Sequence, residues 1–349
     1  MLDPDPRRWG LRAVLSLPDP ILRALTGGGA TYVGGRTLDP QLQFLASQAR
    51  GAAPVPHATP EQVRAACAAA SAAFAGRLEP GVRVEMLTVP GAGDRRVAAR
   101  TYRHPAQDPT APLMLFAHGG GGVIGDLDGC EAFCGILCAV AGCAVLSVDY
   151  ALAPEYRYPA GLEDMLSVYR WSLDQAPRFG APAGSVAVGG ESIGAAFAAA
   201  IAQETRGDGG ATPRLQLLIC PALDIASASP SMTTYADAFP LSRAAHQAFM
   251  AHYMGPGDSP LDPRLSPGLC RDLSGLAPAL VVTAGFDPLL DQGEAYAKAL
   301  RAAGVPTRYR CYDHLVHGFT AFAGLVPSAD RACREIAGLA RFALRSRGA

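Results

Sequence analysis

The spacing of hydrophobic and polar residues changes near residue 80. Before that point apolar side chains recur at helical spacing, and residues 59–62 mark a helix start with an N-cap threonine, then a proline and, at the third helical position, a glutamine. Another helix is expected to begin near Leu38. After that point residues 82–89 and 96–102 alternate like half-exposed strands, joined as a hairpin through residues 90–94. The chain should therefore begin with helices and continue into a sheet.

Five short, nearly unbroken apolar runs follow, as expected for parallel strands buried on both faces. Helical segments such as residues 130–141 and 162–174 separate these runs, and a last strand is expected at residues 307–312. Strands and helices alternating in this order predict an α/β fold, with helices on both faces of a mostly parallel sheet of eight strands that starts antiparallel. The five runs lie at residues 113–117, 144–148, 186–188, 215–219 and 280–283.

A Gly-x-Ser-x-Gly motif stands at the end of one of these strands. It consists of Gly190, Ser192 and Gly194 and leads into an alanine-rich helix. The serine of such a strand-turn-helix lies on a strained turn, where a Cβ on either glycine would collide with a neighbouring strand or helix. The helix N-terminus places positive potential near the hydroxyl. The same short pattern also occurs as a simple turn, so the prediction that Ser192 is a nucleophile depends on finding its partners.

A run of glycines follows the third strand of the predicted sheet. His118 and the four glycines after it lie where the strand of residues 113–117 ends. Backbone N–H groups with no side chains around them can approach a ligand closely, as an oxyanion hole requires. A flexible loop is the alternative, whereas a P-loop is excluded because no Lys-Ser or Lys-Thr pair follows. We predict that the N–H groups of Gly120, Gly121 and Ile193 form an oxyanion hole and that His118 fixes the loop.

The acid that orients the base is expected after the nucleophile in chain order. Asp287 stands closest to the end of the strand at residues 280–283, so we predict that its carboxylate orients an imidazole. Asp291 lies where the helix of residues 292–303 begins, and a role at that helix N-terminus explains it better. Asp224 is a rival that also follows a strand, although a different one.

Two histidines compete for the role of base after the last strand. His317 precedes Gly318 and Phe319, a small residue and an aromatic one that let its ring lean into a pocket. His314 lies in the middle of the loop and is expected to face water. We therefore predict that His317 takes the proton of Ser192 and returns it to the leaving alcohol, while Asp287 holds its tautomer.

Composition narrows the classes of partner. The chain has 30 basic and 31 acidic residues, a formal net charge of −1 and 17% charged residues, so nothing favours binding to nucleic acid or to an anionic membrane surface. No apolar run approaches the length of a membrane span. Pro18 and Pro20 interrupt the stretch in which a signal peptide would need its apolar core.

The nine cysteines form no regular framework, which predicts free thiols and a cytoplasmic protein. Cys130, Cys134 and Cys138 recur at every fourth position and share one helix face, so a metal site is an alternative. No histidine lies at ligand spacing, and cysteine also packs as a small apolar residue. We therefore expect these cysteines to belong to the core, with no metal bound.

Five motifs in this order resemble the bacterial hormone-sensitive-lipase-like (family IV) carboxylesterases of the α/β-hydrolase fold. They lie at residues 118–121, 149–155, 190–194, 287–289 and 317–319, and the resemblance covers the chain from about residue 84 to its end. It implies hydrolysis of short- to medium-chain carboxylic esters through an acyl-enzyme, without a metal or an organic cofactor. The expected partner is a small-molecule ester.

The resemblance also implies a helical cap, made of residues 1–80 and an insertion at residues 224–270, over a core of residues 81–223 and 271–349. The extension before Leu38 either completes the cap or packs against a second subunit of a homodimer. Four large side chains of the insertion either line an acyl pocket or only bury their helix: Phe249, Met250, Tyr253 and Met254.

The elbow departs from the family pattern, which has aspartate, alanine and glycine where this chain has Glu191, Ile193 and Ala195. The backbone N–H of Ile193 is present whatever its side chain, so the departure bears on the substrate rather than on the mechanism. Two alternatives to an esterase stay open: an amide- or lactone-directed hydrolase with the same triad, and a non-catalytic small-molecule receptor. The presence of both Asp287 and His317 argues against the receptor.

Overall fold

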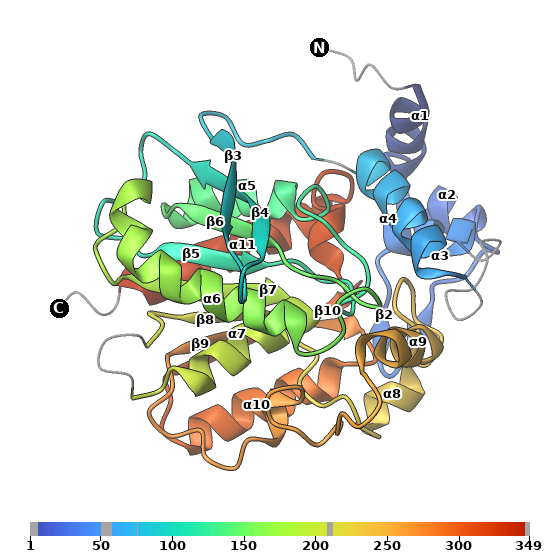
Figure 1. Cartoon of the computed structure of the whole chain (residues 1–349). Helices are drawn as coiled ribbons and strands as arrows, with labels where there is room; N and C mark the ends of the chain where they lie inside the picture. The colour runs from blue at the N-terminus through green and yellow to red at the C-terminus, as the bar shows by residue number, and fades with distance from the viewer. Residues whose placement is uncertain (1–5, 50–57, 75, 208–211, 346–349) are drawn as a thin grey trace.

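The computed structural model describes residues 6–49, 58–74, 76–207 and 212–345. Eight strands of these residues form one sheet, which runs through the middle of the molecule, in the order β10-β9-β8-β7-β5-β6-β4-β3 (Figure 1). Their bounds are β3 (Arg83–Pro90), β4 (Arg96–Arg103), β5 (Leu113–Ala117), β6 (Val145–Asp149), β7 (Val186–Glu191), β8 (Gln216–Ile219), β9 (Ala279–Phe286) and β10 (Thr307–Val316).

The sheet is parallel except at one edge. Strands β6, β5, β7, β8, β9 and β10 pair parallel in that order, whereas β4 pairs antiparallel with both β3 and β6. Each predicted strand begins within one residue of an observed strand. The predicted mostly parallel sheet with an antiparallel start is therefore confirmed. The apolar runs were a reliable signal because β5, β7, β8 and β9 are buried along their whole length.

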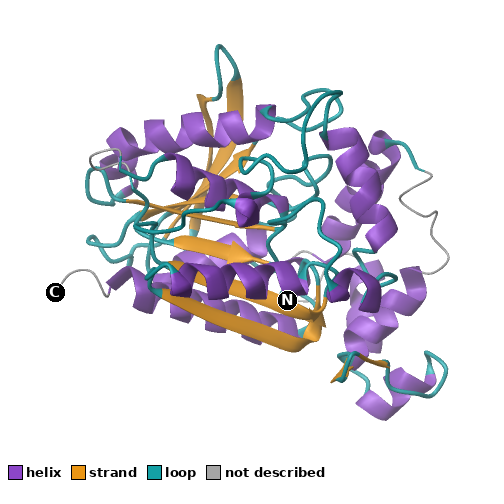
Figure 2. Cartoon of the chain, turned by 90° about the horizontal axis from the view of Figure 1, so that it is seen from below, coloured by secondary structure: helices purple, strands orange, loops and turns teal. Residues whose placement is uncertain are grey.

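Helices cover both faces of the sheet (Figure 2). One face carries α6 (Ala160–Gln175), α7 (Ile193–Glu204) and α10 (Leu290–Ala302), while the other carries α5 (Glu131–Ile136), the π-helical η2 (Leu137–Ala141) and α11 (Pro327–Arg345). The sides of these helices that face the sheet are apolar, so each face of the sheet has its own hydrophobic core. Among the described residues, no helix combines the length and the apolar character needed to cross a bilayer.

The remaining helices lie at one end of the sheet, on the right in Figure 1. The N-terminal region contributes α1 (Pro6–Leu15), α2 (Asp19–Ala24), α3 (Pro40–Ala49) and α4 (Pro60–Phe74), together with a small hairpin of β1 (Tyr32–Val33) and β2 (Arg36–Thr37). The segment between β8 and β9 contributes α8 (Pro230–Thr234), α9 (Arg243–Tyr253) and the 3-10 turn η4 (Pro267–Leu269). Two further 3-10 turns are η3 (Ala176–Phe179) and η5 (Phe319–Phe322).

The helix start predicted at Thr59 is confirmed as a reciprocal cap. The Gln62 N–H donates to the Thr59 Oγ1 at 3.3 Å, and the Thr59 N–H donates to the Gln62 Oε1 at 2.9 Å. The spacing of Cys130, Cys134 and Cys138 is explained by packing, because all three side chains are buried in the core on the α5 face.

Candidate active site

Ser192 lies on a sharp turn between strand β7 and helix α7. Its backbone angles are φ 57° and ψ −118°, a left-handed region that few residues with a side chain adopt. A Cβ on Gly190 would clash with the backbone of Gly194, and a Cβ on Gly194 would clash with the carbonyl of Ala117 on β5. The predicted strand-turn-helix elbow is therefore present, and it lifts the Ser192 hydroxyl above the carboxyl end of the sheet.

Ser192, His317 and Asp287 form one hydrogen-bonded line. The Asp287 Oδ2 lies 2.8 Å from the His317 Nδ1, and the Ser192 Oγ lies 3.0 Å from the His317 Nε2. An ionised carboxylate only accepts, so Nδ1 carries the ring proton and Nε2 accepts from the hydroxyl. The three side chains meet because each follows the carboxyl end of a parallel strand. Strands β10 and β9 are adjacent, β7 lies two places from β9, and their carboxyl ends lie on the same side of the sheet. All three are buried.

The other candidate acids and the other candidate base lie elsewhere. The side chain of His314 is exposed on β10. Asp291 accepts a hydrogen bond from the Ser231 N–H at 2.8 Å and so connects α10 to α8. Asp224 accepts from the Ala226 N–H within its own loop at 3.1 Å. None of the three takes part in the hydrogen bonds of His317.

Burial and charge act in opposite directions on His317. Burial works to lower the pKa of its imidazole, but the charge of Asp287, the hydrogen bond to that carboxylate and the charge of Glu191 outweigh it. The pKa of His317 is therefore raised above its usual 6.5. A raised pKa makes the ring a stronger base toward the Ser192 hydroxyl.

The glycine run forms a loop beside the Ser192 hydroxyl. Within the described part of the chain, the backbone N–H groups of Gly120, Gly121 and Ile193 donate to no protein acceptor. All three residues line the same cavity as Ser192. Free backbone donors around a cavity next to a hydroxyl have the composition of an anion site.

His118 holds this loop rather than joining the Ser192 line. Its Nδ1 lies 2.7 Å from the Gly119 carbonyl oxygen, and its ring stacks on Tyr150 with 4.3 Å between the centroids. The Tyr150 hydroxyl donates to the His118 carbonyl at 2.9 Å. These contacts fix the backbone from which the glycine loop starts.

Comparisons with known proteins agree with this geometry. The family described as the α/β-hydrolase fold matches residues 114–321. The carboxylic ester hydrolase LipN of Mycobacterium tuberculosis is 41% identical over 319 residues, which cover 89% of this chain and 84% of that protein. The chain belongs to the α/β-hydrolase family. The expected resemblance to bacterial carboxylesterases of that family is thereby confirmed.

Two further relatives of this α/β-hydrolase are esterases. Ethyl acetate hydrolase of Pseudomonas putida is 35% identical over 263 residues, which cover 74% of this chain and 83% of that protein. The solved structure of a hyperthermophilic esterase from the archaeon Pyrobaculum calidifontis matches with a TM-score of 0.79 at 33% identity, covering 87% of this chain and 98% of that one. Both comparisons extend far beyond the motif around the serine, since they cover 74% and 87% of this chain.

The cavity beside Ser192 has a volume of about 270 Å³ in this hydrolase. One wall consists of the glycine loop and the elbow, and α9 supplies another through Phe249 and Met250. Four side chains were expected either to line an acyl pocket or only to bury their helix. Phe249 and Met250 line the cavity, whereas Tyr253 is packed in the core and Met254 does not belong to the lining. Helix α4 closes a further side with Val63 and Cys67.

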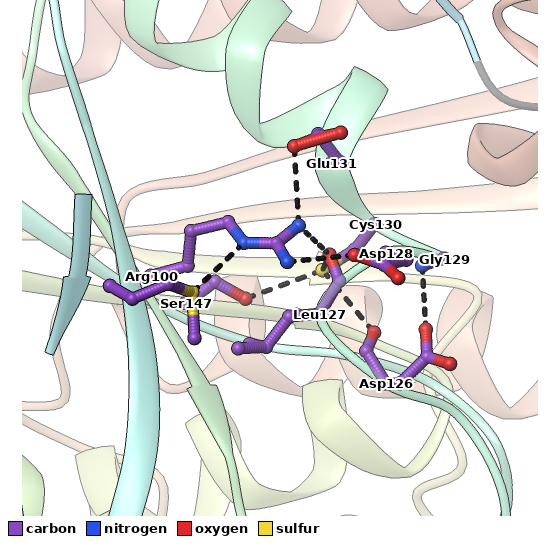
Figure 3. Close-up of polar contacts among 9 residues, drawn as sticks. Arg100, Asp126, Leu127, Asp128, Gly129, Cys130, Glu131 and Ser147 are labelled. Carbon is purple, nitrogen blue, oxygen red and sulfur yellow. Dashed lines mark hydrogen bonds and ion pairs between the residues drawn. The ribbon is translucent and has the colours of Figure 1, made fainter. Parts of the chain in front are cut away.

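A clamp around Arg100 fixes the part of the cavity wall that lies between β5 and α5. Figure 3 shows its guanidinium, from β4, reaching the loop at residues 126–130 and Glu131 at the start of α5. It donates to the Asp128 Oδ1 at 2.7 Å and to the Glu131 Oε1 at 3.2 Å. The Cys130 Sγ lies 3.3 Å from the Ser147 Oγ of β6. Cys130 and Asp126 line the cavity, so the clamp sets the position of its wall.

Several residues of the site carried no sequence signal. The Cys220 Sγ lies within 4.8 Å of ligand atoms of Asp287 and His317, the one group among the described residues that could hold a metal ion. Both imidazole nitrogens of His317 already have partners in the Ser192 line, so these donors fit a proton relay better than a metal. His246, on α9, also lines the cavity. A lone cysteine and a lone histidine have no motif from which a role could be predicted.

Proposed function

We propose that this carboxylesterase uses Ser192 as nucleophile, His317 as general base and acid, and Asp287 as the residue that orients the imidazole. The observation that carries the proposal is the unbroken line of hydrogen bonds from Asp287 through His317 to Ser192, with separations of 2.8 and 3.0 Å. Both lie within the range expected for a nucleophile, a base and its orienting group.

The first half of the reaction transfers the acyl group to the enzyme. The Ser192 oxygen bonds to the ester carbonyl carbon while its proton moves to the His317 Nε2. The bond from that carbon to the alcohol oxygen then breaks, and the imidazolium gives its proton to the leaving alcohol. Asp287 stabilises the imidazolium in between. A water molecule repeats these steps against the acyl-enzyme, giving the acid and free Ser192.

The negative charge on the carbonyl oxygen requires donors that are already in place. The N–H groups of Gly120, Gly121 and Ile193 suit this role, because they have no protein acceptor within the described residues and border the cavity of Ser192. Removing one such donor typically costs about 100- to 1,000-fold in rate. We assign the oxyanion hole to these three groups.

Cavity size supports short- to medium-chain esters. A volume of about 270 Å³ must hold both the acyl and the alcohol part of the substrate. We propose that residues 1–80 and 224–270 act as the cap over this cavity, since α4 and α9 supply two of its walls. The free thiols of all nine cysteines support a cytoplasmic setting for the enzyme.

The decisive experiment compares Ser192→Ala with Ser172→Ala. We expect the first to lower kcat/KM for p-nitrophenyl butyrate by about 10,000-fold or more, because the nucleophile is lost. Ser172 is a buried serine of α6 whose hydroxyl donates to the Val168 carbonyl of the same helix at 2.7 Å, so the loss of that hydroxyl should leave kcat/KM nearly unchanged. An undiminished rate for Ser192→Ala would refute the proposal. A matched p-nitroanilide tests the amide-directed alternative, which predicts comparable cleavage of the anilide.

A further inference from the structure

Arg64 reaches from helix α4 to the backbone of the hydrolase core. Its Nε donates to the Val123 carbonyl at 2.8 Å, and one terminal nitrogen donates to the Ala153 carbonyl at 2.7 Å. The two terminal nitrogens also form a bidentate pair with the Glu155 carboxylate, each at 2.7 Å. A planar guanidinium with partners on several sides is held in one orientation. Arg64 is not among the described residues that line the cavity of Ser192, so any effect of it on catalysis passes through the backbone that it holds.

The first of these bonds continues into the glycine loop through two peptide groups. The Val123 carbonyl and the Ile124 N–H belong to one peptide group, and that N–H donates to the Gly120 carbonyl at 3.0 Å. The Gly120 carbonyl in turn shares its peptide group with the Gly121 N–H. A trans peptide group is planar and its C=O and N–H point in opposite directions, so fixing one end of the group aims the other. Arg64 thereby aims the Gly121 N–H, one of the three proposed oxyanion donors.

The second bond reaches the same carbonyl by another route. Ala153, which Arg64 holds by its carbonyl, donates its N–H to the Gly122 carbonyl at 2.8 Å. The Gly122 carbonyl shares its peptide group with the Val123 N–H, which donates to the Gly120 carbonyl at 3.1 Å. Both routes therefore end on the Gly120 carbonyl, which accepts from two N–H groups that lead back to one guanidinium. Hydrogen bonds arranged in such chains polarise and strengthen one another.

A different residue holds the neighbouring donor. The Gly120 N–H shares its peptide group with the Gly119 carbonyl, which lies 2.7 Å from the His118 Nδ1. Since a carbonyl only accepts, the ring N–H of His118 donates to it. The aim of the Gly120 N–H thus depends on His118, and that of the Gly121 N–H depends on Arg64. Substitution of Arg64 should then weaken one donor rather than collapse the whole site.

We propose that Arg64 is a positioning residue for the reaction, which aims the Gly121 N–H at the carbonyl oxygen of the substrate through the backbone of residues 120–124 and 153. The inference rests on the proposed function, because the Gly121 N–H is an oxyanion donor only in that reaction. It gives helix α4 a part in the chemistry beyond its place in the cavity wall. The anion site is complete only when α4 lies on the core.

Removing the guanidinium tests the proposal. Arg64→Met keeps a long stem without a donor, and we expect kcat for p-nitrophenyl butyrate to fall by about 10- to 100-fold, less than for the loss of a whole donor. KM should change by less than about threefold, because the cavity wall keeps its side chains. Arg64→Lys replaces the planar fork by one ammonium nitrogen and should recover only part of the loss. If the positive charge alone mattered, Arg64→Lys would equal the wild type.

A transition-state analogue separates the aim of the donors from substrate binding. With 1,1,1-trifluoroheptan-2-one, the Ser192 oxygen bonds to the ketone carbon, the hydroxyl proton passes to the His317 Nε2, and the ketone oxygen becomes an anion in the oxyanion hole. Heptan-2-one has the same chain but remains a ketone. The ratio of the two inhibition constants therefore measures how well the enzyme stabilises the anion. Arg64→Met should reduce the preference for the fluorinated ketone by about the factor lost in kcat.

Arg206→Met is the matched control. Arg206 also donates to two backbone carbonyls, those of Asp272 at 2.8 Å and Ser274 at 3.1 Å, and it pairs with the Asp272 carboxylate at 3.3 Å. Its side chain is 32% exposed, close to the 28% of Arg64. It lies just beyond the C-terminal end of α7, whereas the elbow lies at the N-terminal end of that helix. We expect Arg206→Met to leave kcat and the inhibition ratio near their wild-type values.

Several results would overturn the inference while leaving the esterase reaction intact. They are an unchanged kcat and inhibition ratio in Arg64→Met, a rise in KM alone, or equal losses in Arg206→Met. A wild-type kcat in Arg64→Lys would overturn it as well, so the test stands even if Arg64→Met does not fold. If instead Ser192→Ala hydrolysed the ester like the wild type, the proposed function itself would fail.

Discussion

The Thr320 hydroxyl donates a hydrogen bond to the Oε1 of Glu191, the residue before Ser192, at 2.9 Å. Glu191 is buried. Burial raises its pKa, while the charge of His317 and the bond from Thr320 oppose that rise. The charge of Glu191 in turn contributes to the raised pKa of His317. The glutamate that replaces the family's aspartate thus forms a second carboxylate near the base.

The pH profile should report the raised pKa of His317. The base acts only when neutral, so kcat/KM should fall as the pH drops through a value above the usual 6.5, by about tenfold per unit below it. Glu191→Gln removes one negative charge that favours the imidazolium, which lowers the pKa of His317 and moves the acid limb to lower pH. Glu191→Asp keeps the charge and should leave the limb closer to that of the wild type. Initial rates from pH 5 to 9 check both, and an acid limb unmoved by Glu191→Gln would contradict the electrostatic role.

The two histidines of β10 should differ sharply on substitution. His317→Ala removes the base and should lower kcat/KM by about 10,000-fold or more. The side chain of His314 is exposed, and the Asp39 N–H donates to its backbone oxygen at 3.0 Å. His314→Ala should therefore change kcat/KM by less than about twofold. Equal losses for the two variants would show that the base is assigned wrongly.

Gly121→Ala should damage the anion site through a clash with the cap. The residue has φ +63°, and an added Cβ would lie 2.7 Å from the Cβ of Phe249 on α9. We expect kcat to fall by about 100-fold as the loop shifts its N–H groups. Gly93, with φ +58° and open space around it, is the matched control. Gly93→Ala should cost about 1 kcal/mol of stability by backbone strain, with kcat unchanged. Equal kcat values for the two variants would argue against the loop as the anion site.

Arg100→Leu should loosen the cavity wall. It removes the clamp that joins β4 to Asp128 and Glu131, and we expect about 1–2 kcal/mol lower stability because the arginine is mostly buried. The wall contributes to substrate binding, so KM should rise by about 3- to 10-fold while kcat changes less. Arg103, three residues on in β4, has a long 3.9 Å contact with Glu85 as its one ion pair among the described residues, and it serves as the control. Thermal unfolding and steady-state kinetics decide, and parallel effects in Arg100→Leu and Arg103→Leu would contradict the clamp.

The sequence predicted those features that depend on local pattern. Buried strands such as β5 and β9 consist of apolar runs, which the sequence displays directly. The elbow could be recognised because a side chain on Gly190 or Gly194 would clash, so a glycine stands at both positions of the motif. Asp287 and His317 could be chosen because each stands where a parallel strand ends, and the carboxyl ends of neighbouring parallel strands meet at one edge.

What the sequence left out depends on contacts between distant segments. The two-residue strands β1 and β2 are too short to show alternation. The hydrogen bond between Glu191 and Thr320 joins residues 129 positions apart, so no spacing rule could find it. His246 has the same difficulty, since a lone histidine on an apolar helix face is most often an ordinary core residue. Its position at the Ser192 cavity becomes visible only once α9 is placed.

The packing of α9 on the glycine loop links substrate entry to chemistry. Phe249 stands directly over Gly121, and Tyr253 stands in the same way over Gly122. Any movement that lifted α9 to admit an ester would also remove these two side chains from the glycine loop, whose backbone N–H groups would then no longer be held in position for the carbonyl oxygen of the substrate. If α9 had to lift to admit an ester, we would expect turnover only after it had settled back on Gly121 and Gly122, even though Ser192, His317 and Asp287 stayed aligned throughout.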